Sequence, residues 1–244
     1  MKTIAPGIFL VCALWPHFAT AQSSAEPDFI FSGEPVFEEG TVPCDVPYYS
    51  EGSVCRKLLQ SFAYMRGGMG WEASKGLITD GASIPDWAHG LIGTPDTPEY
   101  VKAATLHDHY CRPENHVRDY RETHRMFYHA LVDSGLNPMH AGIMYGAVLI
   151  GGPKWSTKVL GEDCEKIDGP ICVKTSDEVP PDGEGSVDFV GAKYDELPME
   201  DILLMLQNAI EAGNLSPDDI ERLAVLERLK YGYSLPSLRL VVEE

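Results

Sequence analysis

Basic residues are scarce in this chain. Its 244 residues include 19 lysines and arginines against 37 aspartates and glutamates, so the formal net charge is −18. A surface of this charge repels nucleic acid and anionic membranes. We therefore expect no nucleic-acid partner. Calcium, a hard cation with carboxylate ligands, is favoured by the same acidic surface.

An apolar run long enough to span a bilayer is also missing. Lys2 precedes an apolar core at residues 8–15 and small residues at 19–21, a pattern typical of a secretory signal peptide cleaved before Gln22. An uncleaved anchor is the alternative, but this run is too short to cross a bilayer comfortably. We predict an exported protein, periplasmic or extracellular, with no integral membrane segment after cleavage.

Cysteines are few. Five of the six follow the predicted signal peptide: Cys44, Cys55, Cys111, Cys164 and Cys172. In an oxidising compartment their short separations predict two local disulfides, Cys44–Cys55 and Cys164–Cys172. Cys111 is then left over. A lone helical cysteine is most often a small buried hydrophobe, although a disulfide through Cys111 stays open.

The chain also lacks a nucleotide-binding loop, an HExxH or paired CxxC zinc motif, and any internal repeat. Residues 176–188 are acidic and rich in proline and glycine, which indicates a linker. We divide the chain into a signal peptide (1–21), an N-terminal extended segment (22–55), a central domain (56–172), an acidic linker (173–196) and a helical C-terminal extension (197–244).

Two amphipathic helices are predicted in the extension, one at residues 200–211 and one after a capping sequence at 216–219. A pair this small needs a partner surface. Docking on the central domain is the commoner outcome, and binding of another protein is the alternative. The residues expected to face inward are Ile202, Leu203, Leu206 and Ile210 in the first helix, and Ile220, Leu223, Leu226 and Leu229 or Val225 in the second.

Three helices with short turns are predicted in the central domain. The first begins with Thr97 and Pro98, which are typical of a helix start, and ends near Cys111. The second covers residues 117–136 and packs on the first as an antiparallel hairpin, because the connection is short. The third covers residues 139–150.

Two short strands are expected before these helices, at residues 62–65 and 76–78, with glycines between them. The predicted fold class is therefore α+β and mainly helical. It consists of a central helical hairpin plus a third helix, a short β element and a C-terminal helical extension.

The first central helix ends in candidate functional residues. His107, Asp108, Tyr110 and Cys111 lie within five positions, and His107 and Cys111 share a face at i, i+4. His124 interrupts the apolar stripe of the next helix, where a polar residue needs a partner. His107 and His124 are therefore expected to lie within reach across the hairpin. Two interpretations stay open: a hydrogen-bonded core histidine, or a site in which Cys111 could also act as a nucleophile beside His107.

Four motifs in order resemble the phage-associated and bacterial domain of unknown function 1353 family. They are the TDGASIP sequence at residues 79–85, the His107–Tyr110 segment, a polar residue followed by phenylalanine at 124 and 127, and residues 144–148. The resemblance covers roughly residues 62–155. It implies a domain and no established activity. The family usually has an acid where this chain has His124.

The His-Asp helix is more distantly similar to the catalytic helix of secreted phospholipase A2 enzymes. That resemblance implies that His107 is a general base that activates water, Asp108 a calcium ligand and Tyr110 part of a supporting hydrogen-bond network. The glycine-rich residues 65–70 are a loose candidate for a calcium loop.

A transition-metal site is the alternative. His107, His124 and one carboxylate, from Asp108 or Asp80, would form a zinc site with an open position. The cofactor is thus unknown, with calcium favoured over zinc. The predicted function is an exported His/Asp metal-assisted hydrolase, and the rival is a non-catalytic envelope or phage-related structural or interaction protein. The substrate is unknown, and a protein partner could bind through the C-terminal helices.

Overall fold

The computed structural model describes residues 28–44, 53–84, 88–94, 97–155, 197–213 and 215–231. The predicted signal peptide, the Cys164–Cys172 pair and the acidic linker lie outside these residues. Helical residues make up 52% of the described part of the chain. The helices are α1 (His89–Ile92), α2 (Pro98–Tyr110), a short 3-10 turn η2 (Pro113–Asn115), α3 (Tyr120–Asp133), α4 (Pro138–Gly151), α5 (Met199–Gly213) and α6 (Pro217–Lys230).

The helix starts follow from their capping residues. Asp119 accepts a hydrogen bond from the Glu122 backbone before α3, and Asn137 accepts one from Met139 N before α4. Ser216 and Asp219 form a reciprocal capping box before α6. The predicted helices are therefore confirmed to within a few residues at their ends.

The prediction of a mainly helical fold is wrong, because strands form two small antiparallel sheets. Strands account for 14% of the described residues. One sheet has the order β1-β3-β4, and β2 pairs with β5 in the other. Most of these strands are too short to show an alternating pattern in the sequence. Their bounds are β1 (Phe29–Phe31), β2 (Arg56–Lys57), β3 (Phe62–Arg66), β4 (Met69–Ala73) and β5 (Ile78–Thr79).

The glycine-rich residues 65–70 are the end of β3, the turn at Gly67 and Gly68, and the start of β4 in an antiparallel hairpin. Gly67 and Gly68 have φ angles of 56° and 78°, a backbone conformation that suits a tight hairpin turn. The hairpin pairs Tyr64 with Trp71. The first predicted strand corresponds to β3 and the second overlaps β5 at Ile78, whereas β4, the partner of β3, was not predicted.

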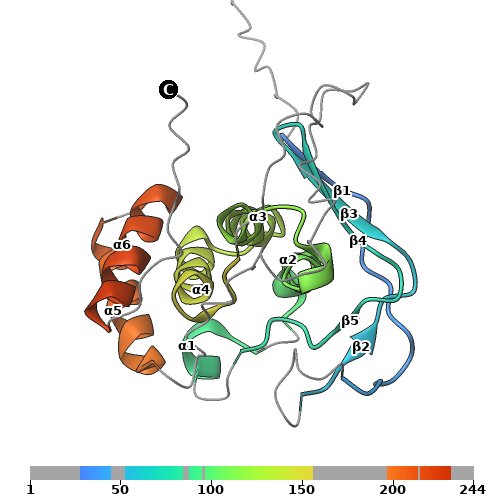
Figure 1. The fold of residues 1–244 in the computed structure, drawn as a ribbon, viewed down its shortest axis with the longest axis horizontal. Coiled ribbons are helices and arrows are strands. Elements are labelled where there is room, and N and C mark those ends of the chain that lie inside the picture. The colour runs from blue at the N-terminus through green and yellow to red at the C-terminus, as the bar shows by residue number, and fades with distance from the viewer. Residues whose placement is uncertain are drawn as a thin grey trace, which may run out of the picture.

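Helix α2 lies between the larger sheet and α3 (Figure 1). The Tyr110 ring meets the edge of Trp71 of β4, with ring centroids 4.9 Å apart. On the other side α2 packs along α3, and α3 packs on α4. The helices therefore bury one face of the larger sheet. The α2–α3 helical hairpin, which carries the candidate residues, lies between this sheet and α4.

The C-terminal helices α5 and α6 dock on α4 (Figure 1), which confirms the commoner of the two expected outcomes. Gly142 and Gly146 allow this close approach. A Cβ at Gly146 would lie only 2.8 Å from the Leu206 side chain. The four inward residues predicted for α5 are buried. In α6 the prediction was partly wrong, because Leu226 and Leu229 are exposed and the fully buried positions are Ile220, Ala224, Glu227 and Arg228.

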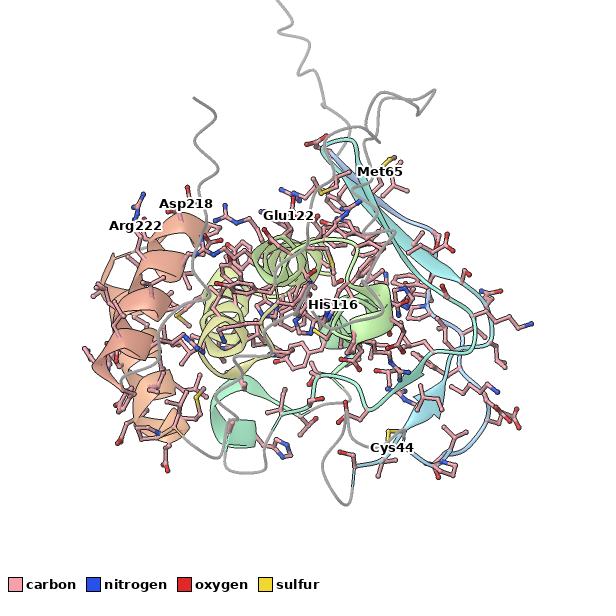
Figure 2. All side chains as sticks on the ribbon, viewed as in Figure 1. Cys44, Met65, His116, Glu122, Asp218 and Arg222 are labelled. Atoms are coloured by element: carbon pink, nitrogen blue, oxygen red, sulfur yellow. A yellow bond between two sulfur atoms is a disulfide. The ribbon has the colours of Figure 1, made fainter. Side chains whose placement is uncertain are left out.

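A disulfide joins Cys44 to Cys55, with the two Cα atoms 5.2 Å apart, as predicted. Cys44 lies at the edge of the molecule beside β2 (Figure 2). Of the cysteines in the described residues, Cys111 alone is free. Among the same residues, no helix combines the length and apolar character that crossing a bilayer requires.

Candidate metal and histidine centre

His107 and Cys111 occupy the last turn of α2 and its cap. The helix stops at Tyr110, with Cys111 as its C-cap, because Pro113 follows two residues later. Their i, i+4 spacing places both side chains on the α3 side of the helix. The Cys111 Sγ atom lies 3.5 Å from His107 Nε2 and 3.6 Å from His107 Nδ1.

His124 approaches the same point from α3. The short connection through η2 makes α2 and α3 antiparallel neighbours, and His107 Nε2 lies 2.9 Å from His124 Nδ1. The prediction that these two histidines meet across the hairpin is confirmed. The ring of Phe127, one turn along α3, also packs on His107 with centroids 4.6 Å apart.

The hydrogen bonds define the protonation of both rings. The Pro153 carbonyl, 3.0 Å from His124 Nε2, can only accept, so that nitrogen carries the proton. In a neutral His124, Nδ1 is then an acceptor, and His107 Nε2–H donates to it. His107 Nδ1 is left with its lone pair on the edge near Cys111. This tautomer assignment follows from the bonding network.

Burial keeps the three side chains neutral. His107 is 9% exposed and His124 is 0% exposed. Burial lowers the pKa of His107 to about 4. Burial also holds the pKa of His124 well below its ordinary value, and the neighbouring His107 and Lys154 add to that effect. The pKa of the Cys111 thiol is raised well above its ordinary value by burial and by the Asp108 carboxylate.

A neutral thiol beside a neutral imidazole differs from the ion pair of an activated cysteine nucleophile. Neutral imidazoles and a neutral thiol are instead the forms that metal ligands take before binding, because a thiol loses its proton when it binds a metal. One ligand atom from each of His107, Cys111 and His124 lies within 4.8 Å of the others. We call these three residues the HCH cluster. Two nitrogens and one sulfur suit zinc or another transition metal, whereas calcium requires oxygen ligands.

Asp108 and Tyr110 turn away from the HCH cluster toward the sheets. Asp108 accepts a hydrogen bond of 2.6 Å from Thr79 of β5. The Tyr110 hydroxyl accepts one of 3.0 Å from the Glu72 backbone of β4. Both residues thus attach α2 to strands, and neither belongs to the HCH cluster.

Asp80 lies in a separate loop after β5. Its carboxylate accepts hydrogen bonds from Ser83 at 2.6 Å and from Ser53 at 3.2 Å. Burial raises the pKa of this carboxyl group. Ser83 has a φ of 44°, so the bond to Asp80 stabilises a backbone conformation that serine rarely adopts. In the structure, the Asp80 carboxylate stabilises this loop through its hydrogen bonds, and Asp80 does not belong to the HCH cluster.

Sequence reasoning gave one contributor a different role and missed three others. Cys111 was considered as a nucleophile and not as a ligand, although its i, i+4 spacing from His107 was visible. The Pro153 carbonyl and the buried Lys154 were not predicted. His116 was also missed: it is 5% exposed and stacks on Trp155 with ring centroids 3.9 Å apart, in the interior of the helical part (Figure 2). Burial lowers its pKa to about 4.

The comparisons with known proteins agree with the motif order. Residues 56–148 match the family model DUF1353, protein of unknown function. The predicted family resemblance is confirmed over this region. The match contains β2 to β5, α1 to α3 and most of α4, and it therefore includes the whole HCH cluster.

Two relatives from Sinorhizobium fredii are similar to this chain. The uncharacterized protein y4iH is 41% identical over 132 residues, covering 53% of this chain and 52% of its own length. The uncharacterized protein y4jT is 39% identical over 97 residues, covering 39% of this chain and 28% of its own. The chain thus spans about half of the first relative and less of the second. No solved structure matches.

Proposed function

We propose that the HCH cluster binds a transition metal, with zinc as the best match, and that the protein is an exported metal-assisted hydrolase. The convergence of three ligand atoms within 4.8 Å carries this proposal. Tetrahedral zinc sites combine histidine nitrogen at about 2.0 Å and cysteine sulfur at about 2.3 Å, so small side-chain shifts bring these donors to ligand distance.

The surroundings of His124 support the metal. Histidines that bind a metal usually donate their second ring N–H to a carbonyl or carboxylate, which orients the ring. His124 has this arrangement, because its Nε2 lies against the Pro153 carbonyl and its Nδ1 faces His107. Metal binding would replace the His107–His124 hydrogen bond: with His107 Nε2 and His124 Nδ1 on the metal, the neutral His107 ring would carry its proton on Nδ1 instead of Nε2.

Three protein ligands are the number that catalytic zinc sites use, with the fourth position left for water. Zinc bound in this way would supply a water molecule that ionises near neutral pH. Cys111 is partly exposed and the two histidines are buried, so the open position is expected on the cysteine side. The Cys44–Cys55 disulfide supports the exported part of the proposal, because such bonds persist in oxidising compartments.

Burial favours a second candidate, a structural metal site in a non-catalytic envelope or phage-related protein. His124 is completely buried and His107 nearly so. A closed site of this kind stabilises the hairpin without admitting substrate. Both candidates share the metal site, which a metal-binding measurement tests. A substrate screen separates the catalytic candidate from the structural one.

The test is titration of the metal-free protein with Zn²⁺ and with Co²⁺, whose thiolate charge-transfer absorption reports a cysteine ligand. We expect one site, with both the cobalt band and tight zinc binding lost in Cys111→Ser. His129→Ala, on the same helix as His124 but outside the cluster, is the matched control and should bind as the wild type does. Equal zinc affinity in wild type and Cys111→Ser, or no binding by the wild type, contradicts the metal site.

A screen of the zinc-loaded protein against lipid, peptide and peptidoglycan substrates then tests hydrolysis. The catalytic proposal expects activity that disappears with chelator, and with Cys111→Ser, while His129→Ala retains it. A zinc-loaded protein with no activity on any of these classes would favour the structural site.

A further inference from the structure

The turn after α4 connects the HCH cluster to a second group of buried polar side chains. Pro153 in this turn is the residue whose carbonyl accepts the hydrogen bond from His124 Nε2–H. Trp155 holds the end of the turn, because its indole N–H donates to the Arg118 carbonyl. The position of the Pro153 carbonyl therefore depends on what holds the residues just before it.

Two buried basic side chains hold those residues. Lys154 Nζ donates to the carbonyls of Ile150 at 3.0 Å and Gly152 at 2.9 Å. Arg228 Nη1 donates to the same Ile150 carbonyl at 2.6 Å. Both side chains are 0% exposed, and burial, together with the nearby Arg228, lowers the pKa of Lys154 to about 6. The last carbonyls of a helix lack partners within the helix and carry partial negative charge, so the end of α4 provides a favourable place for the Arg228 guanidinium.

Arg228 comes from α6, far from this turn in the sequence and beyond the region that matches the family model. A fully buried guanidinium is costly to desolvate, and an aliphatic side chain could fill a helix-packing position without that cost. Its contact with Ile150 at the end of α4 places a charge-assisted bond three residues before Pro153. Arg228 thus contacts Ile150, three residues of backbone lead from Ile150 to Pro153, and the Pro153 carbonyl contacts His124 in the cluster.

We propose that Arg228 is a positioning residue for the HCH cluster. It holds the turn at residues 150–153, the Pro153 carbonyl then orients His124, and His124 orients His107. The C-terminal helices are in this view a support for the site and not only a cover for α4. The inference rests on the proposed metal centre, although its effect on His124 can be measured without metal.

The test uses Arg228→Gln, which keeps a hydrogen-bond donor but removes the charge and shortens the reach, and Arg228→Met, which removes both. Arg222→Met is the matched control, because Arg222 lies on the same helix with its side chain 74% exposed (Figure 2). The readouts are the zinc dissociation constant and the imidazole nitrogen and proton resonances of His124 in metal-free protein.

We expect Arg228→Met to weaken zinc binding by about 10-fold, the lower end of the cost of losing a direct partner of a ligand, because Arg228 acts on that partner through the backbone, and Arg228→Gln to weaken it several-fold. Both should shift the His124 Nε2–H resonance, and Arg222→Met should change neither readout. If Arg228→Met does not fold, Arg228→Gln decides the matter. Unchanged zinc affinity and an unchanged His124 resonance in a folded Arg228 variant overturn the inference, even where stability falls.

The two proposals fail in different ways. If wild-type protein binds no zinc, the metal centre is wrong. The His124 resonance in metal-free Arg228→Gln still reports whether α6 positions the histidine. If zinc binds but that resonance and the affinity do not respond, the metal centre stands and the positioning role is lost.

Discussion

The two sides of α2 use neighbouring residues in different ways. On the sheet side, Asp108 and Tyr110 make single hydrogen bonds to β5 and β4, and these contacts hold the helix in place. On the α3 side, His107 and Cys111 meet His124 in a cluster of three donor atoms. Within these five residues, the side chains that point to the sheets hold the helix in place, and those that point to α3 form the candidate site.

The largest expected effect tests the sheet side. Tyr110→Ala removes a ring that is 8% exposed and packed on Trp71, and it should cost about 3–5 kcal/mol of unfolding free energy. Tyr110→Phe keeps the ring and should cost about 1 kcal/mol, through the unpaired Glu72 N–H. Urea denaturation measures both. Zinc affinity in Tyr110→Phe should equal that of the wild type, and a 10-fold loss there would show that the two sides are not separate.

The second-largest expected effect is a loss of folding stability in acid, which arises from the buried histidines. Burial holds the pKa of His107 and His116 at about 4, whereas in the unfolded chain it is about 6.5. Between these values the unfolded chain binds more protons, so the free energy of unfolding of metal-free protein falls as the pH falls from 6.5 to 4. The loss is on the order of 1–3 kcal/mol per histidine.

His116→Phe isolates one part of this acid effect. Phenylalanine keeps a ring against Trp155 and removes one titrating group, so the variant should lose less stability between pH 7 and pH 5 than the wild type does. Denaturation curves at the two pH values give the difference. Identical pH dependence in the two proteins would mean that His116 is not held neutral.

The smallest expected effect concerns Asp108. Asp108→Asn keeps an acceptor for Thr79 and should cost about 1 kcal/mol or less, with no change in zinc affinity. Burial and, next, the Asp108 carboxylate raise the pKa of Cys111, so Asp108→Asn should make Cys111 react faster with an alkylating reagent. The measurement is mass mapping of the Cys111 peptide after alkylation at several pH values. Loss of metal binding in Asp108→Asn would instead support the carboxylate ligand that the sequence predicted.

Local signals explain what the sequence predicted well. Caps at Asp119, Asn137 and Ser216, and Pro98 at the start of α2, depend on neighbouring residues alone, so the helix positions could be inferred. The short α2–α3 connection made the hairpin antiparallel. A polar residue on an inward face requires a partner, and this led to the meeting of His107 and His124.

The sheets could not be inferred in the same way. β2 and β5 have two residues each, and their pairing depends on segments more than 20 residues apart. β4 was not predicted, because Gly70 and the glycines of the preceding turn weaken the strand signal of this short segment. The exposure of Leu226 and Leu229 also escaped the sequence, since Arg228 and Glu227 take the inward positions of α6.

The sequence by itself determined the helices, the local Cys44–Cys55 disulfide, the family resemblance and the pairing of two histidines, because each depends on short spacing along the chain. Only the tertiary structure decided which groups complete the cluster. The helix rotation sends Asp108 and Tyr110 to the strands and Cys111 to the histidines, and it replaces a hard carboxylate with a soft sulfur in the donor set. Pro153 contacts His124, and Arg228 contacts Ile150 in the same turn. Both contacts join segments that are distant in the sequence, so no local sequence pattern predicts them.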